Sequence, residues 1–340
     1  MIKNLICIGV LFTAIALADS AGPIISGYAD AGYKAAMINK IDGESVYDTN
    51  KFLIREGGIF IGQKWGAEWQ ALVDLEYTGN LGNSTGIFSV SQAYISQNTN
   101  YGISWKLGEF DNIFGYYAGR RHSFEHSLVD TGILQHYFAF QHVGLQGAYD
   151  LGDIAKISAI FANDVNPTSR LNKGTRNPSY GVNLNSKWGI LNASGGILFT
   201  TGSVGVSRNG YIGSLVIEAD LDPLTAGIYG LYNRFDQKEV ADDYGLGVQV
   251  GFNVTQKTSI HGRFEYLRVG SGSFSPPLAM DDMAFPPVAI KSAWAATLGP
   301  EYAFNENLKL KLDYTLYEVN VSQDSIDPAH IIQAAIVANF

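Results

Sequence analysis

Charged and aromatic residues are concentrated between Gly108 and Gly132, in the segment GEFDNIFGYYAGRRHSFEHSLVDTG. The charged side chains that could act on a solute or an ion there are Glu109, Asp111, Arg120, Arg121, Glu125 and Asp130. A long connection without regular structure is usually either functional or disordered. The aromatic side chains of the segment favour a folded loop, because disordered segments are poor in aromatic residues. We therefore expect an ordered loop in which opposed charges form an electrostatic site.

The same segment contains a candidate zinc motif. His122-Ser123-Phe124-Glu125-His126 has the H-x-x-E-H spacing of metallopeptidases, in which both histidines bind zinc and the glutamate acts as the base. Such a site requires a helix and a third protein ligand, and the charges of Arg120 and Arg121 oppose a bound cation. We favour a solvent-lining role or ordinary loop packing for these residues, and we expect no catalytic residue, no metal and no cofactor.

The N-terminal residues have the pattern of a secretory signal. Lys3 provides the positive start, Leu5 to Leu17 form the apolar run, and Ala16-Leu17-Ala18 is a small-residue cleavage site. The run is shorter than the roughly 20 residues of a spanning helix, although a retained anchor is the alternative. We expect residues 1–18 to be removed and residues 19–340 to form one domain. Cys7, the single cysteine, would leave with the signal, so the mature chain would contain no disulfide.

Composition and charge narrow the class of protein further. The chain has a formal net charge of −9, and loss of Lys3, the one charged residue before Asp19, makes it −10. An acidic chain of this kind is a poor nucleic-acid partner. After the signal no stretch approaches 18 consecutive apolar residues, yet aromatic residues make up 12% of the chain and 38 residues are glycine. These features favour a secreted β protein or a transmembrane β-barrel.

Alternation with a period of two predicts strands along most of the chain. Between residues 67 and 78, apolar residues alternate with Glu68, Gln70, Asp74 and Glu76, so one face suits lipid and the other suits water. About sixteen such runs are expected, near residues 24–37, 52–63, 67–78, 86–96, 102–108, 133–149, 155–163, 180–187, 190–200, 211–221, 224–234, 244–254, 259–269, 291–303, 308–319 and 329–340. The expected fold class is all-β, a transmembrane antiparallel up-and-down β-barrel.

The connections between these runs alternate between short and long. Residues 64–66 and 188–189 are short connections, whereas residues 38–51, 79–85 and 270–290 are long ones rich in turn formers, charge or proline. Up-and-down barrels of outer membranes have short periplasmic turns and long external loops. Closure is required because backbone groups in lipid need partners. A β-sandwich would not present lipid-compatible faces on nearly every strand, and no four-strand repeat of a propeller is visible.

The last run, His330 to Phe340, alternates and ends on phenylalanine. With this ending the chain resembles the porins of Gram-negative outer membranes over its whole length, in its signal, its strand number and its long third external loop. The resemblance implies an outer-membrane homotrimer whose water-filled channel passes small hydrophilic solutes and ions by passive diffusion. It also implies that the third loop, here Gly108–Gly132, folds inward and narrows the channel. Phe114-Gly115 matches only a fragment of the family's loop signature Pro-Glu-Phe-Gly-Gly.

In that family the acidic loop residues face a basic wall across the pore. Alternation directs several basic side chains inward, with strand 52–63 the least regular, and the predicted pore wall is Arg55, Lys106, Arg263, Lys309 and Lys311. The excess of acidic residues favours a weak preference for cations. A substrate-specific channel and a structural or adhesive surface barrel are the alternatives.

Overall fold

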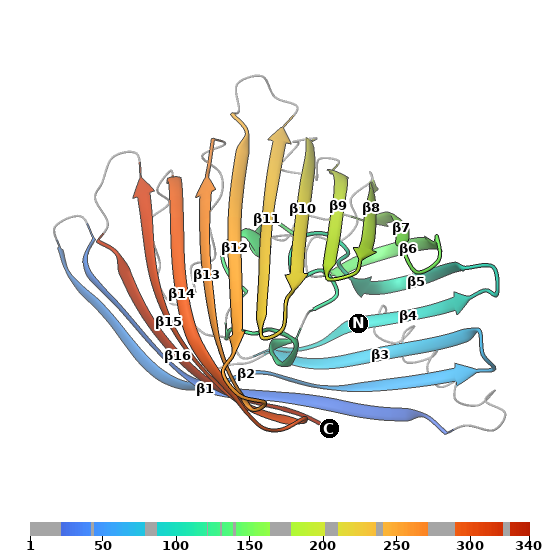
Figure 1. Ribbon diagram of the computed structural model, residues 1–340, viewed down its shortest axis with the longest axis horizontal. Helices are drawn as coiled ribbons and strands as arrows, with labels where there is room; N and C mark the ends of the chain where they lie inside the picture. The colour runs from blue at the N-terminus through green and yellow to red at the C-terminus, as the bar shows by residue number, and fades with distance from the viewer. Residues whose placement is uncertain are drawn as a thin grey trace.

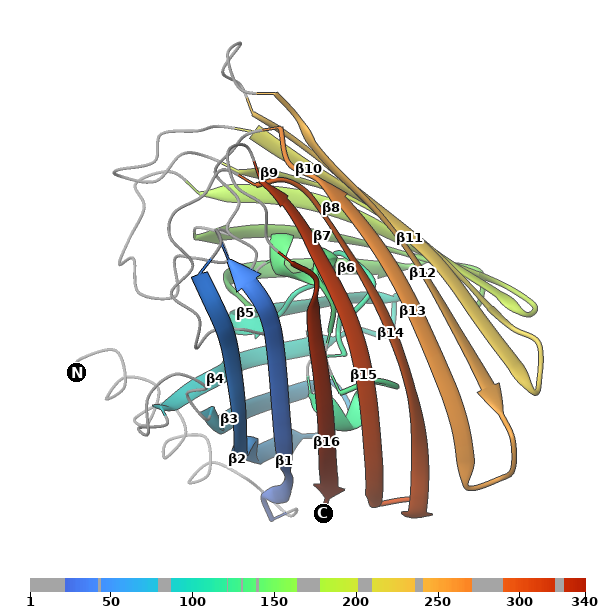
Figure 2. The same cartoon turned by 90° about the vertical axis from the view of Figure 1, so that its left-hand side faces the viewer.

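The computed structural model describes residues 22–41, 44–78, 87–120, 122–129, 131–138, 141–163, 178–200, 210–235, 241–270, 290–321 and 327–340. In these ranges sixteen strands form one closed antiparallel barrel, in which neighbours in sequence are neighbours in the sheet and β16 pairs with β1 (Figures 1 and 2). The predicted all-β up-and-down barrel is therefore confirmed. The predicted signal, residues 1–18, lies outside the described residues.

The strands follow one another around the barrel in sequence order. They are β1 (Ile24–Ile41), β2 (Glu44–Trp65), β3 (Trp69–Thr78), β4 (Ile87–Asn98), β5 (Ile103–Asp111), β6 (Gln141–Asp150), β7 (Ala155–Asn163), β8 (Ser179–Trp188), β9 (Leu191–Thr200), β10 (Gly210–Asp220), β11 (Leu224–Phe235), β12 (Asp243–Asn253), β13 (Thr258–Arg268), β14 (Ile290–Asn305), β15 (Leu308–Val321) and β16 (Ala329–Asn339). Among the described residues the helices are two 3-10 turns, η1 (Ser123–Glu125) and η2 (Leu134–Tyr137), and neither has the length and apolarity to cross a membrane.

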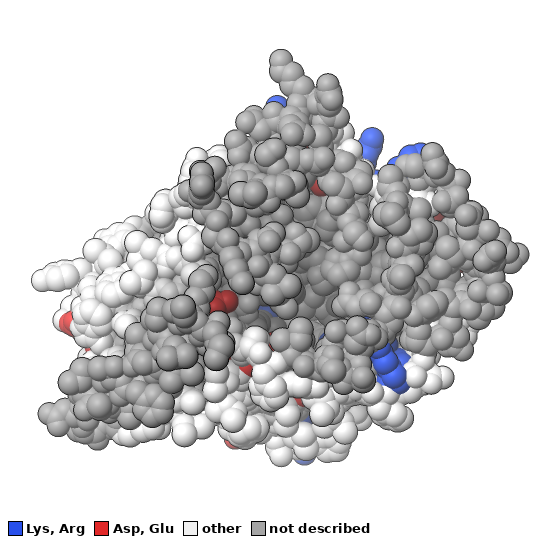
Figure 3. Space-filling model, turned by 180° about the vertical axis from the view of Figure 1, so that it is seen from behind, with Lys and Arg blue, Asp and Glu red and all other residues white. Residues whose placement is uncertain are grey.

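The two faces of the barrel differ in chemistry because side chains alternate along each strand. In β13, Ile260 and Phe264 are 43% and 48% exposed on the outer face, whereas Arg263 and Glu265 are 4% and 0% exposed on the inner face. The described surface in Figure 3 carries only scattered acidic and basic side chains. An apolar outer face and a polar inner face are typical of a barrel that spans a membrane.

Two expected strand boundaries are corrected by the structure. β1 and β2 continue their pairing as far as Ile41 opposite Glu44, so most of the expected long connection 38–51 is strand. The run expected from residue 133 begins as a strand only at Gln141, and η2 precedes it. Its large apolar residues Ile133, Leu134, Tyr137 and Phe138 recur with helical spacing, which a strand pattern does not have.

The connection between β5 and β6 begins after Asp111, three residues later than expected. We call the described residues of this connection, 112–120, 122–129 and 131–138, the lumen segment, because Figure 1 shows this green stretch inside the curve of the strands. Its apolar side chains Phe114, Leu134 and Phe138 are at most 3% exposed and pack with inward residues of the wall. The segment therefore shares a hydrophobic core with the inside of the barrel.

Candidate functional site

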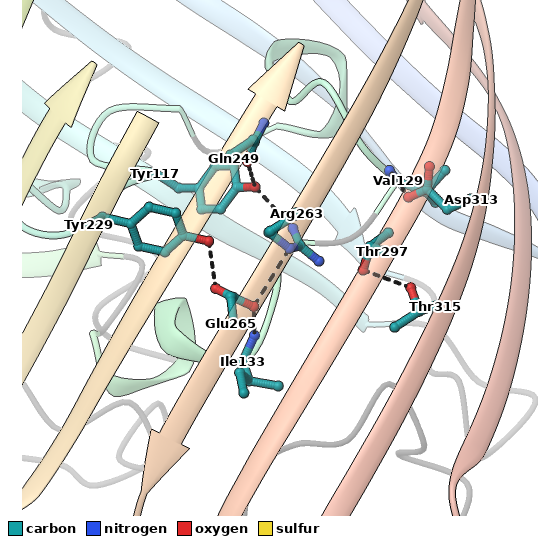
Figure 4. A network of polar contacts seen from close by, with 10 residues as sticks. All are labelled: Tyr117, Val129, Ile133, Tyr229, Gln249, Arg263, Glu265, Thr297, Asp313 and Thr315. Atoms are coloured by element: carbon teal, nitrogen blue, oxygen red, sulfur yellow. Dashed lines mark hydrogen bonds and ion pairs between the residues drawn. The ribbon is translucent and has the colours of Figure 1, made fainter. Parts of the chain in front are cut away.

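A buried ion pair on β13 holds the lumen segment near both of its ends, at Tyr117 and Ile133. Arg263 lies with its Nε 3.5 Å from Glu265 Oε2, and both side chains are almost fully buried. Arg263 Nη1 donates to the hydroxyl of Tyr117 at 3.0 Å, and the backbone N–H of Ile133 donates to Glu265 Oε2 at 2.7 Å. Tyr229 of β11 donates to the other oxygen of Glu265 at 2.8 Å (Figure 4). Because a buried charge is costly unless it is paired and bonded, these contacts couple the segment to the wall.

A second set of contacts ties the segment to the strands that close the barrel. Lys311 Nζ donates to the carbonyl oxygen of His126. The N–H of Val129 donates to Asp313 Oδ2 at 2.5 Å, and Arg55 Nη2 donates to the carbonyl oxygen of Val129 at 2.6 Å. Two predicted wall cations thus bond to backbone oxygens of the segment. They do not face its carboxylates across a gap.

Inward-facing glycines receive aromatic side chains of the segment. A Cβ atom added at Gly181 of β8 would lie 2.7 Å from the ring of Phe114, and one at Gly196 of β9 would lie 2.8 Å from the same ring. A Cβ at Gly227 of β11 would lie 3.0 Å from the ring of Tyr116. Side chains at these positions would displace the segment, so the glycines form niches for Phe114 and Tyr116.

Arg120 anchors the segment at a more exposed place. Its guanidinium group binds both carboxylate oxygens of Glu218 on β10, at 3.1 and 2.9 Å, and lies over the ring of Tyr116. The Arg120 side chain is 42% exposed, so solvent weakens this pair relative to the buried one at Glu265. The geometry nevertheless fixes the direction of the guanidinium group, because a two-point contact restricts its rotation.

The predicted position of Glu109 in the pore is corrected by the strand register. Glu109 belongs to β5 and lies opposite Ala93 on β4 and Val143 on β6. Val143 is 44% exposed on the outer face of the barrel. Directly paired residues share a face of the sheet, so Glu109 lies on the outer side of β5 and not on the lumen side.

The other predicted acidic residues make local contacts. Gln92 Nε2 donates to Asp111 Oδ2 at 3.1 Å, which holds the carboxylate at the end of β5. Glu125 Oε2 accepts the backbone N–H of His122 at 3.1 Å and so stabilises the η1 turn. The two remaining charged residues, Arg121 and Asp130, lie outside the described residues.

The histidines of the candidate zinc motif have separate surroundings. His126 Nε2 lies 2.6 Å from the carbonyl oxygen of Arg120, to which it donates, and burial lowers the pKa of His126 to about 3. His122 packs against the ring of Tyr28, with centroids 3.9 Å apart. In the part of the chain that the structure describes, no group of three or more His, Cys, Asp or Glu residues could hold a metal ion.

The lumen segment leaves one side of the inner wall accessible near the short turns. On the covered side, inward residues of β12 to β15 such as Gln249, Arg263, Thr297 and Lys311 are at most 5% exposed. On the other side, polar inward residues near the short turns are half-buried or exposed, and they include Gln70, Lys106, Gln146, Lys156, Asn185, Lys187, Asn192 and Ser194. Of the predicted wall cations, Lys106 lies on this accessible side. Lys309 is half-buried and lies over the ring of Phe124.

A cavity of about 450 Å³ occupies part of the accessible side, between Arg120 and the inner faces of β7 to β10. Lys156, Lys187 and Asn192, which line it, were not among the predicted site residues. The alternation that directs Asn183 and Asn185 inward also directs Lys187 inward, so the sequence contained this signal.

Comparison with known proteins agrees with this geometry. Residues 25–337 match the model of the family described as beta-barrel porin-2, OmpL-like. A search of curated proteins finds no match. The outer membrane channel DcaP of Acinetobacter baumannii superposes with a TM-score of 0.69 at 13% identity, with 95% of this chain and 99% of that chain covered.

Two further solved structures have the same fold. The anion-selective porin from Comamonas acidovorans has a TM-score of 0.66 at 12% identity, over 94% of this chain and 100% of that one. The in-vitro folded OmpT of Vibrio cholerae, in its trimer form, has a TM-score of 0.59 at 10% identity, over 94% of this chain and 100% of that one. The closed sixteen-stranded barrel and the match across nearly all of its strands place this chain in the OmpL-like beta-barrel porin-2 family of outer-membrane porins.

Proposed function

We propose that the barrel is a water-filled channel through which small hydrophilic solutes and ions cross the outer membrane by passive diffusion. The observation that carries the proposal is the row of accessible polar side chains at the short-turn ends of the inner faces of β3 and β5 to β9, beside the lumen segment. A row of this kind is costly to bury dry, because each unpaired charge would cost several kcal/mol. Fold and family point to a channel and away from an enzyme.

The lumen segment is proposed to narrow this channel from one side. Its contacts with Arg263, Glu265, Lys311 and Asp313 remove that wall from solvent, so the passage follows β3 to β10. The wall that faces the passage carries the cations Lys106, Lys156 and Lys187. We therefore propose a weak preference for anions, in place of the weak cation preference expected from the net charge of the chain.

We also propose a homotrimer with its short turns in the periplasm, after removal of residues 1–18. The outer faces of β1 and β16 present Gly27, Ala29 and Ala31 beside Ala334 and Ala338, and these small residues allow two barrels to approach closely. Migration in mild detergent, without boiling, at the size of a monomer alone would contradict the trimer.

Step currents in planar bilayers test the proposed function. The mature protein should produce discrete steps whose conductance rises in proportion to potassium chloride concentration, and liposomes that contain it should swell in small sugars faster than in large ones. A folded barrel, recognised by its heat-modifiable migration, that gives neither current nor swelling would contradict the proposal. Folded protein without current would instead favour a structural or adhesive role.

A further inference from the structure

The cavity between Arg120 and the inner faces of β7 to β10 lies at the short-turn end of the channel. The tight connection after β6 forms one edge of it through Gly152, Asp153 and Ile154. Arg120 and Glu218 close it toward the lumen segment. A volume of about 450 Å³ is in the size range of a small organic solute.

Strand pairing arranges the polar residues of this cavity in two neighbouring rows. In the first row Lys156 of β7 lies opposite Asn185 of β8, which lies opposite Ser194 of β9. In the second row Lys187 of β8 lies opposite Asn192 of β9. Directly opposed residues on one face have Cβ atoms about 5 Å apart, so these five side chains form one patch.

The patch is rich in hydrogen-bond donors. Each lysine offers three N–H groups and each asparagine amide offers two, whereas the Ser194 hydroxyl already donates to Asn183 Oδ1 at 3.2 Å. Glu218 continues the second row on β10, but both of its carboxylate oxygens are bound by Arg120. The carboxylate that would repel an anion most directly is thus neutralised by the segment that crosses the lumen.

The lining also disfavours other solutes. Among the described residues that line the cavity none is aromatic, so they offer a sugar ring no surface on which to stack. The apolar lining residues are few, and the open side faces water. Two carboxylates lie near the cavity: Asp153 at the turn, and Asp150, whose Oδ1 is 3.6 Å from Lys156 Nζ. The Lys156 side chain nevertheless remains 45% exposed.

We propose that this cavity is a binding site for small organic carboxylates in transit through the channel. The ammonium groups of Lys156 and Lys187 bind the carboxylate, and the side-chain amides of Asn185 and Asn192 donate to its oxygens. The proposal rests on the channel function and refines it: carboxylates pass by a saturable route with a weak site near the short-turn end. The site also gives a role to the two pairs in which a lysine lies directly opposite an asparagine on the neighbouring strand.

The test uses succinate and its neutral analogue succinamide with the mature protein. In planar bilayers, succinate at constant ionic strength should reduce potassium chloride current with a saturating dependence, and succinamide should not. The double variant Lys156→Gln/Lys187→Gln should weaken the apparent affinity at least about tenfold, as expected when charge-assisted hydrogen bonds are lost. Lys64→Gln is the matched control, because Lys64 is exposed at the end of β2, outside the cavity, and loses the same charge.

Isothermal titration of succinate into the detergent-solubilised protein separates the two proposals. Saturable binding that the double variant loses and the control retains supports the site, even if the channel function fails. A conducting channel that shows neither block nor heat of binding would overturn the site and leave the channel function standing. An equal loss in Lys64→Gln would show a general effect of charge and would also overturn it.

Discussion

Valine in place of Gly196 should release one end of the lumen segment from the wall. Gly196 faces inward on β9, and a Cβ atom there would lie 2.8 Å from the ring of Phe114 and 2.7 Å from Asn183 Oδ1. Contacts this short cannot persist, so the ring of Phe114 must leave its niche. Gly195, its neighbour, faces outward and has open space around it, with its nearest contact at 3.6 Å.

The size of the effect follows from the packing. Overpacking of a filled site costs about 1 to 3 kcal/mol, and complete loss of a buried Phe contact costs about 3 to 5 kcal/mol. A change of about 2 kcal/mol shifts the ratio of docked to undocked segment by about thirtyfold. The far end remains attached through bonds to Asp313 and Glu265, each worth about 1.5 to 3 kcal/mol. We therefore expect local loosening and not release of the whole segment.

Single-channel recording measures this loosening. Gly196→Val should increase the open-channel noise and the mean conductance, because a loosened segment obstructs the passage less and moves more. Gly195→Val adds the same side chain to the outer face and should leave both quantities at the wild-type level. If Gly196→Val and Gly195→Val conduct alike, the segment is not seated in the glycine niches or does not border the passage.

Three further predictions concern the lumen segment and the inner wall around it. Asp313→Asn should loosen the residues around Val129, because a charge-assisted bond becomes a neutral one, and limited proteolysis should then cleave the segment faster than in wild type. Lys106→Gln should shift the reversal potential in a salt gradient toward cations, whereas Arg263→Gln should change noise more than selectivity because Arg263 is buried; the reverse pattern would contradict the proposed passage. Burial lowers the pKa of His126 to about 3 while the segment is packed against the wall. When the segment leaves the wall, His126 regains an ordinary histidine pKa, so between that pKa and about 3 the released segment binds a proton that the packed segment does not. Docking should therefore weaken as the pH falls through this window, with noise rising, and His126→Gln should reduce that rise.

The fold could be predicted from the sequence because one signal repeats many times. Alternation on each strand and the alternation of short and long connections both reflect closure in a membrane, and sixteen strands average out errors at single boundaries. The expected strand from residue 133 is wrong because Ile133, Leu134, Tyr137 and Phe138 have helical spacing, and this spacing, not apolarity alone, separates a helical turn from a strand.

The site was predicted in part. Alternation placed Arg263 and Lys311 inward, but it carries no information on what covers an inward side chain, and both are buried beneath the segment. Glu109 shares its parity with Ile103 and Leu107, which are exposed on the outer face, so strict alternation would have excluded it from the pore. Contacts such as Lys311 with the carbonyl of His126 depend on the path of the segment, which local pattern does not specify.

The division of the inner wall into a covered side and an accessible side is tested most directly by thiol labelling. Cys7 is the single cysteine of the chain, so a mature protein without residues 1–18 offers no background reaction. Ser194→Cys and Gln146→Cys place a thiol on the accessible side, and Thr297→Cys places one at a position that is 4% exposed on the covered side. A cationic methanethiosulfonate added to open channels should reduce the current quickly in the first two variants and leave Thr297→Cys nearly unchanged. Reaction at Thr297→Cys as fast as at Ser194→Cys would show that the lumen segment does not cover that wall.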